Sequence, residues 1–114
     1  MDSCIFCKII DGSIPARKIH EDDDLVAIED INPVAPHHIL IIPRKHIVNA
    51  LDLTAEDDAL VGRVFRAAAA IARQRGVDGR GFRIVQNTNA DAGQSVFHIH
   101  FHLLAGRHLG WPPG

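Results

Sequence analysis

The 114-residue sequence has no apolar run long enough to cross a bilayer, and its Met-Asp-Ser start lacks a charged-then-apolar secretory signal pattern. We therefore expect a cytoplasmic protein. Neither sign of charge dominates, since 12 Lys and Arg residues stand against 14 Asp and Glu residues. This balance provides no electrostatic basis for binding nucleic acid or a membrane surface. Cysteine is scarce, and Cys4 and Cys7 would stay reduced in the cytosol, which argues against a disulfide framework.

Internal repeats, low-complexity tracts and linkers are also missing, so we expect a single domain over residues 1–114. Apolar periodicity and turn signals predict its elements. In chain order they are a short helix over residues 4–11, a hairpin of residues 18–20 and 25–28, a strand over 37–42, a helix over 54–75, and strands over 83–88 and 96–104. One long helix with about five mostly antiparallel strands defines an α+β fold.

Three histidines, His98, His100 and His102, alternate with bulky apolar residues, and such alternation predicts a β-strand with the histidines on one face. We expect that face to be open and the opposite one to be buried. The opposite face carries Phe97, Ile99, Phe101 and Leu103. On the strand rise the outer histidines lie about 13–14 Å apart, too far to bind one metal together. The row therefore indicates a nucleophile with helpers, with plain core histidines or a metal-binding tract as alternatives.

A loop of small residues, 91–95, leads into this strand. Gly93 allows a ligand to approach the backbone closely, and the N–H groups of such a loop can surround a phosphate. Gln94 and Ser95 add side-chain donors at the same place. The loop thus predicts an anion site beside the nucleophile.

Residues 93–104 read Gly-Gln-Ser-Val-Phe-His-Ile-His-Phe-His-Leu-Leu and resemble the signature of the histidine triad family of nucleotide hydrolases and transferases, His-φ-His-φ-His-φ-φ with φ apolar. The resemblance extends over nearly the whole chain, from Ile5-Phe6 to the terminal Trp-Pro-Pro-Gly of residues 111–114. That tail resembles the Hint branch, the purine nucleoside phosphoramidases. The resemblance implies the family's HIT-like fold.

The resemblance also assigns catalytic roles. His100 would be the nucleophile and would form a nucleotidyl-imidazole intermediate through the ring nitrogen farther from the backbone. An imidazole suits this role because its pKa of about 6.5 leaves it unprotonated near neutral pH. His102 and His38 would bind phosphate oxygens, and the loop of residues 93–95 would stabilise charge in the transition state. Ser95 would relay a proton to the leaving amine.

The resemblance also implies roles in nucleotide binding. The Asp30 carboxylate would accept both ribose hydroxyls, Phe6 and Ile31 would flank the purine, and Asn87 would reach the phosphate region. By resemblance, two subunits pair through the long helix and the strand region 83–88, and each tail reaches its partner's nucleotide pocket. The full predicted nucleotide-binding set is Phe6, Asp30, Ile31, Asn87, Gly93, Gln94, Ser95, His100, His102 and Trp111.

A second constellation is the Cys-x-x-Cys pair, Cys4 and Cys7. A closed zinc site needs four ligands, and His46 and His98 are the candidates for the remaining two. Some bacterial histidine triad proteins and galactose-1-phosphate uridylyltransferases look similar here, whereas the animal Hint pattern lacks the cysteines. We expect a structural zinc that the chemistry itself does not require. Two buried, reduced cysteines are the alternative.

The function expected from these features is hydrolysis of P–N bonds in purine nucleoside 5′-phosphoramidates by a homodimer that binds purine mononucleotides. A dinucleoside polyphosphate hydrolase or nucleotidylyltransferase of the same superfamily is the enzymatic alternative. A nucleotide-sensing scaffold protein with incidental activity is a third hypothesis, and a hydrolase that uses the triad as zinc ligands is a fourth.

Overall fold

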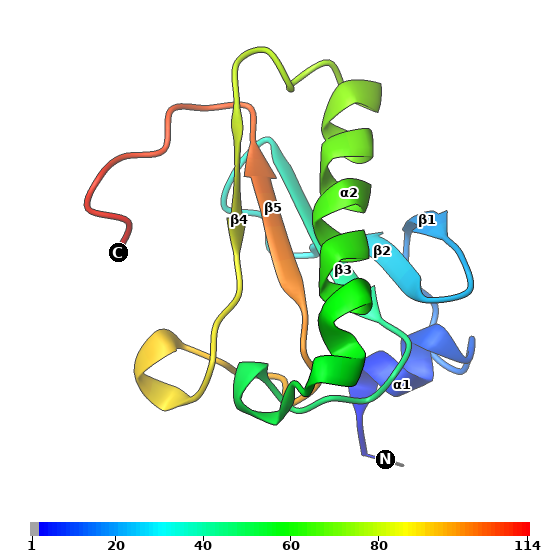
Figure 1. Ribbon diagram of the computed structural model, residues 1–114. Helices are drawn as coiled ribbons and strands as arrows, with labels where there is room; N and C mark the ends of the chain where they lie inside the picture. Colours follow the sequence, from blue (N-terminus) through cyan, green and yellow to red (C-terminus); the bar gives the residue numbers. More distant parts are fainter. Residues whose placement is uncertain (1–2) are drawn as a thin grey trace.

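A computed structural model describes residues 3–114. The first two residues of the Met-Asp-Ser start, from which we expected no secretory signal, lie outside the described part. Five strands form one antiparallel sheet in the order β1-β2-β3-β5-β4, with α2 across one face (Figure 1). The elements are α1 (Ile5–Ile10), β1 (Lys18–Glu21), β2 (Leu25–Glu29), β3 (His37–Pro43), α2 (Asp58–Gln74), β4 (Phe82–Val85) and β5 (Phe101–Ala105). The predicted α+β fold, with one long helix and a short N-terminal helix, is confirmed.

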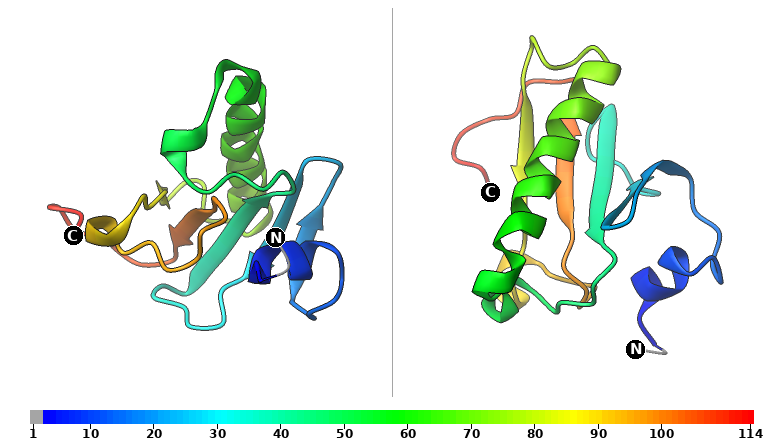
Figure 2. Two further views of the ribbon diagram at one scale, coloured as in Figure 1. Left: turned by 90° about the horizontal axis from the view of Figure 1, so that it is seen from below. Right: turned by 45° about the vertical axis from the view of Figure 1, so that its right-hand side comes forward.

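Both faces of the central strands are covered. Alternate residues of β2 and β3 face α2, and the others face α1 on the opposite side of the sheet (Figure 2). The cluster under α2 includes Leu25, Ala27, Ile39, Ile41, Val64, Ala68 and Ile71. The cluster under α1 includes Phe6, Ile9, Val26, Ile28, Leu40 and Ile42. Packing on both faces explains why these strands are almost continuously apolar in sequence.

The long helix begins with a capping box. Asp57 accepts a hydrogen bond from the backbone N–H of Thr54 at 3.0 Å, and a short 3-10 helix over Ala55–Asp57 leads into α2. At the other end Gly76 adopts a φ of 70°, which favours glycine and ends the helix. The predicted helix over residues 54–75 therefore agrees with the 3-10 helix Ala55–Asp57 and α2 (Asp58–Gln74) taken together. No helix of the described residues is long and apolar enough to span a membrane.

The histidine-bearing strand is shorter than predicted, because β5 begins at Phe101 and not at residue 96. The ladder with β3 ends at the pair Ile41–Phe101, and β3 itself ends at Pro43, which has no N–H to donate. The N–H of Ile99 is instead bonded to the carbonyl of Ile47 at 2.6 Å. Likewise β4 ends at Val85, short of the predicted residue 88.

The prediction that the histidine face is open is also wrong. His98 is 0% exposed and His100 is 8% exposed, since α1 and its neighbouring segments cover this side of the sheet. The opposite face is buried as predicted at Ile99 and Leu103, but Phe97 is 52% exposed, because the chain has left the sheet there. His98 and His100 therefore lie in a largely enclosed environment, and this burial affects their protonation.

Candidate active site and metal cluster

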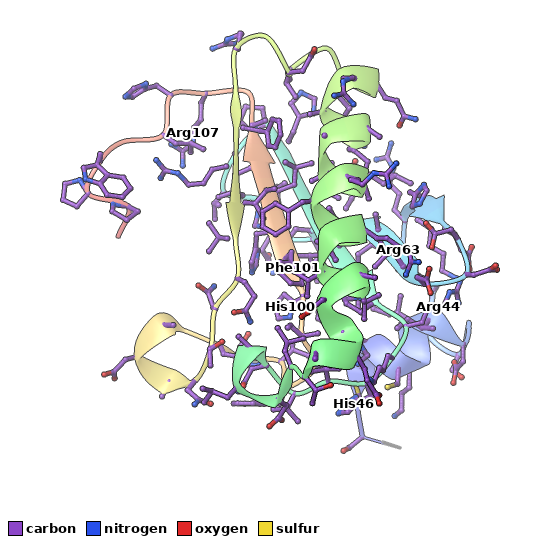
Figure 3. All side chains as sticks on the ribbon, in the orientation of Figure 1. Arg44, His46, Arg63, His100, Phe101 and Arg107 are labelled. Carbon is purple, nitrogen blue, oxygen red and sulfur yellow. The ribbon has the colours of Figure 1, made fainter. Side chains whose placement is uncertain are left out.

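His100 lies at the entrance to β5 (Figure 3), and its hydrogen bond to a carbonyl oxygen defines its tautomer. Its Nδ1 lies 2.8 Å from the carbonyl oxygen of His98. A carbonyl can only accept, so Nδ1 carries the proton and Nε2 presents a lone pair. Burial lowers the pKa of His100, and the ring of Phe6 packs edge-on against it with centroids 4.9 Å apart. A neutral imidazole with a free Nε2 is the form that a nucleophile requires.

His38 and His102 form a second pair on the neighbouring strands β3 and β5. The backbone N–H of Val34 donates to Nδ1 of His38 at 3.1 Å, so His38 carries its proton on Nε2. That nitrogen lies 2.9 Å from Nδ1 of His102 and 3.3 Å from a carboxylate oxygen of Asp30. When Nδ1 of His102 accepts a hydrogen bond from this N–H, the ring proton of His102 sits on Nε2. His102 can therefore donate a hydrogen bond to a phosphate while it stays neutral.

The pKa of His102 has a consequence for stability. Burial, together with the neighbouring His100 and His38, lowers it to about 4. Between this value and the unfolded value of about 6.5, the unfolded chain binds more protons than the folded one, so stability should fall as pH falls through this window. We expect a slope of at most about 1.4 kcal/mol per pH unit from this group. Urea unfolding at several pH values measures it, and the slope should decrease in His102→Asn. Equal slopes in both proteins would contradict this assignment.

An apolar hollow of about 440 Å³ lies beside the histidines, between α1 and β2. Phe6, Ile31 and Asp30 are among its walls, so the structure brings together three residues predicted to hold a nucleoside. Phe6 is buried, whereas Ile31 is exposed at the rim. An apolar hollow with the Asp30 carboxylate in its wall suits a nucleobase attached to a ribose.

The loop before the triad departs from prediction at Gln94. Its side chain is buried, and its amide donates to the carbonyls of Val48 at 2.8 Å and Val96 at 3.2 Å. Its oxygen accepts from the Asn49 side chain at 3.2 Å and from the N–H of Asn89 at 2.8 Å. Gln94 therefore holds the loop in place and does not offer a side-chain donor to a phosphate, since all its polar groups face inward. Asn49 was not among the predicted site residues, and its only local signal is its position before the short 3-10 helix Ala50–Asp52.

Four other predicted contact residues lie in different surroundings. Gly93 adopts a left-handed φ of 82° and is exposed, as is Ser95, so both are open to a ligand. Asn87 is half-buried next to the end of β4. Trp111 is 83% exposed. The C-terminal tail extends beyond the β4 edge, away from α1, and within one chain it does not join the site (Figures 1 and 2).

The four predicted metal ligands converge. Nδ1 of His98 lies 3.4 Å from Sγ of Cys4, 3.5 Å from Sγ of Cys7 and 3.1 Å from Nδ1 of His46. All four ligand atoms lie within 4.8 Å of one another. A tetrahedral zinc with usual bond lengths would separate a sulfur from a nitrogen by about 3.5 Å and two nitrogens by about 3.3 Å. The residues present therefore fit a Cys₂His₂ zinc site.

The protonation states of His98 and Cys7 also support the assignment of a zinc site. Nε2 of His98 donates to the carbonyl of Pro43 at 2.7 Å, and burial lowers the pKa of His98, so the neutral ring directs an unprotonated Nδ1 at the cluster. Burial and the adjacent Cys4 raise the pKa of the Cys7 thiol to about 11, so a thiolate there needs a cation. The group of Asp30, His38 and His102 is different, because the N–H of Val34 occupies Nδ1 of His38 and leaves a proton on Nε2. Hydrogen bonds, not a metal, account for that group.

Comparison with known proteins agrees with this geometry. The HIT domain family model matches residues 11–109. The chain is 47% identical over 109 residues to the purine nucleoside phosphoramidase of Escherichia coli (strain K12), across 96% of this chain and 92% of that protein. It is 49% identical over 113 residues to an uncharacterized HIT-like protein of Synechococcus elongatus, across 99% of this chain and 98% of that protein. A HIT family hydrolase from Legionella pneumophila has the same fold, with a TM-score of 0.96, 46% identity and coverage of 98% and 100%. The chain therefore belongs to the HIT domain family, as its histidine triad signature predicted.

Proposed function

We propose that the protein hydrolyses the P–N bond of purine nucleoside 5′-phosphoramidates through a nucleotidyl-histidine intermediate on His100. The observation that carries the proposal is the bond from Nδ1–H of His100 to the His98 carbonyl, which leaves Nε2 free to attack. The phosphoramidase named among the relatives supports the choice of substrate. The terminal Trp-Pro-Pro-Gly favours the same branch of the family.

The reaction would proceed in two displacements. Nε2 of His100 forms a bond to phosphorus, and the P–N bond breaks as the amine accepts a proton relayed from solvent by the Ser95 hydroxyl. Water then forms a bond to phosphorus and gives up a proton to solvent, the bond to Nε2 breaks, and nucleoside monophosphate leaves with the water oxygen. His102 donates to a phosphate oxygen through Nε2–H, and His38 keeps His102 in the required tautomer. The exposed backbone at Gly93 is available to the same phosphate.

The nucleoside would occupy the apolar hollow between α1 and β2. Phe6 and Ile31 contact the purine, and the Asp30 carboxylate accepts the ribose hydroxyls. Asp30 already lies 3.3 Å from Nε2 of His38, so the ribose would sit directly beside the catalytic histidines. Asn87 would reach the phosphate region from the end of β4.

Zinc would be held by Cys4, Cys7, His46 and His98, where it would supply structural stability and no open position for substrate. The site ties α1 to His46 and His98, which lie 39 and 91 residues beyond Cys7 in the chain. Free thiols in a metal site suit a reducing compartment, which agrees with the cytoplasmic location expected from the sequence.

A substrate panel tests the proposal. Adenosine 5′-monophosphoramidate should be hydrolysed much faster than a diadenosine polyphosphate, and rapid quenching should trap a covalent nucleotidyl adduct on His100. Preferential cleavage of the polyphosphate would favour the dinucleoside polyphosphate hydrolase. Nucleotide binding without turnover of any phosphoramidate would favour the nucleotide-sensing scaffold.

The tail provides a separate prediction, which depends on a homodimer paired through α2 and the β4 region. Two prolines restrict residues 111–114, and the exposed Trp111 has a large apolar area to bury, so the tail is suited to docking on a partner's nucleotide pocket. Deleting residues 111–114 should change relative rates among phosphoramidate leaving groups while the dimer persists in sedimentation analysis. Unchanged relative rates would mean that the tail has no role in specificity.

A further inference from the structure

We propose that His98 is a positioning residue that couples the metal cluster to the nucleophile. Its ring is a metal ligand, and its backbone carbonyl holds Nδ1–H of His100 at 2.8 Å. One residue thus joins the two sites. The kinetic part of this inference rests on the proposed function, whereas the structural part does not.

The backbone around His98 lacks the usual support of a sheet. The β5 ladder begins only at Phe101, so residues 98–100 have no cross-strand partners on β3. The contact that holds this backbone is the bond from the N–H of Ile99 to the Ile47 carbonyl at 2.6 Å. The direction of the His98 carbonyl therefore depends on how the His98 ring is anchored.

That ring is anchored at both nitrogens. Nε2 donates to the Pro43 carbonyl at 2.7 Å, and Nδ1 faces the cluster. With a metal bound, the two contacts fix both side-chain torsions, and the Cα and carbonyl of a fully buried residue follow. Without a metal, Nδ1 of His98 keeps only hydrogen-bond contacts, with Nδ1 of His46 at 3.1 Å and the Cys4 and Cys7 sulfurs at 3.4 and 3.5 Å. These contacts hold the ring less rigidly than a metal bond, so the His98 carbonyl should move in the metal-free protein.

A second connection runs through α1. Phe6 stands between the two cysteines in sequence and packs edge-on against the rings of both His98 and His100, with centroids 6.0 and 4.9 Å apart. Release of Cys4 and Cys7 would loosen the edge contact between Phe6 and the His100 ring, whereas the packing of Phe6 and Ile9 on the sheet would keep α1 and the nucleoside hollow in place. Both connections affect the orientation and tautomer of His100, and neither gives the metal a part in bond breaking.

Nuclear magnetic resonance of protein labelled with ¹⁵N at histidine tests the coupling without any substrate. Zinc-loaded protein should show a protected Nδ1–H signal for His100. Removing zinc with dipicolinate should abolish this signal, and adding zinc should restore it, while the ring signals of His38 and His102 stay in place. An unchanged His100 signal in folded, zinc-free protein would overturn the proposal. Should the zinc-free chain unfold, exchange of zinc for the larger cadmium ion should shift the His100 signal, and an unshifted signal would overturn the proposal equally.

A kinetic comparison distinguishes positioning from general stability. In Cys7→Ser, the rate of nucleotidyl-adduct formation should fall about tenfold while KM changes by less than about twofold, because the loss lies in the reacting geometry and not in substrate binding. Val77→Ala, which opens a cavity in a separate cluster with Ala72 and Ala105, is the control and should keep its rate at temperatures where both variants are folded. Equal losses in the two variants would contradict a positioning role. Failure of every phosphoramidate to react would refute the proposed function, and the resonance result would still decide the coupling.

Discussion

Replacing His100 with alanine is expected to lower turnover of an adenosine 5′-phosphoramidate by about a thousandfold or more, because removing a covalent nucleophile removes the reaction path itself. His100 is the histidine whose Nδ1–H is bonded to a carbonyl and whose Nε2 is free. Steady-state turnover with a fluorogenic leaving group measures the loss. Quenched reactions of the variant should contain no nucleotidyl adduct.

Nucleotide binding should largely survive in His100→Ala, because the hollow that includes Phe6, Ile31 and Asp30 does not require the His100 ring. Calorimetric titration with AMP checks this point. His20→Ala is a suitable control, since His20 pairs with Asp22 at the surface, 2.7 Å away, and should leave turnover unchanged. If His100→Ala retained near-normal turnover, another residue would have to be the nucleophile.

Loss of the metal should have the largest effect on stability. The protein purified without chelators should contain about one zinc per chain, and stripping the metal should lower the free energy of unfolding by about 3 kcal/mol or more, since binding energy at a closed site is folding energy. For a domain of this size we expect a fall in Tm of about 10 °C or more. Metal analysis by mass spectrometry and calorimetric unfolding measure the two quantities.

The double variant C4S/C7S provides the control for the chelator. It should unfold at a low temperature with or without dipicolinate, because the site it lacks is the one that the chelator empties. Wild-type protein that contains no zinc and has the same Tm in the presence and absence of chelator would refute the site. The two cysteines would then be ordinary reduced residues beside α1.

Much of the site could be predicted because the information is local in the chain. The alternation of His98, His100 and His102 with apolar residues places them on one side of the backbone, whatever the rest of the fold does. The spacing of Cys4 and Cys7 on one turn of helix likewise brings two thiols together. The α+β fold and the helix over 54–75 followed from periodicity and from the capping residues at its start.

Features that depend on partners far along the chain were decided only by the tertiary structure. The strand begins at Phe101 because Pro43, on a different strand, ends the ladder, and the side chain of Gln94 faces inward because Asn49 and Val48 receive it there. The proton positions depend on the N–H of Val34 and the carbonyl of Pro43, which no local pattern connects to a histidine. By itself the sequence determined which side chains are candidates for the chemistry, since residue type and period are written along the chain. The tertiary structure decided which nitrogen of each histidine holds a proton and which atoms can share a metal, because hydrogen-bond partners are set by packing between distant segments.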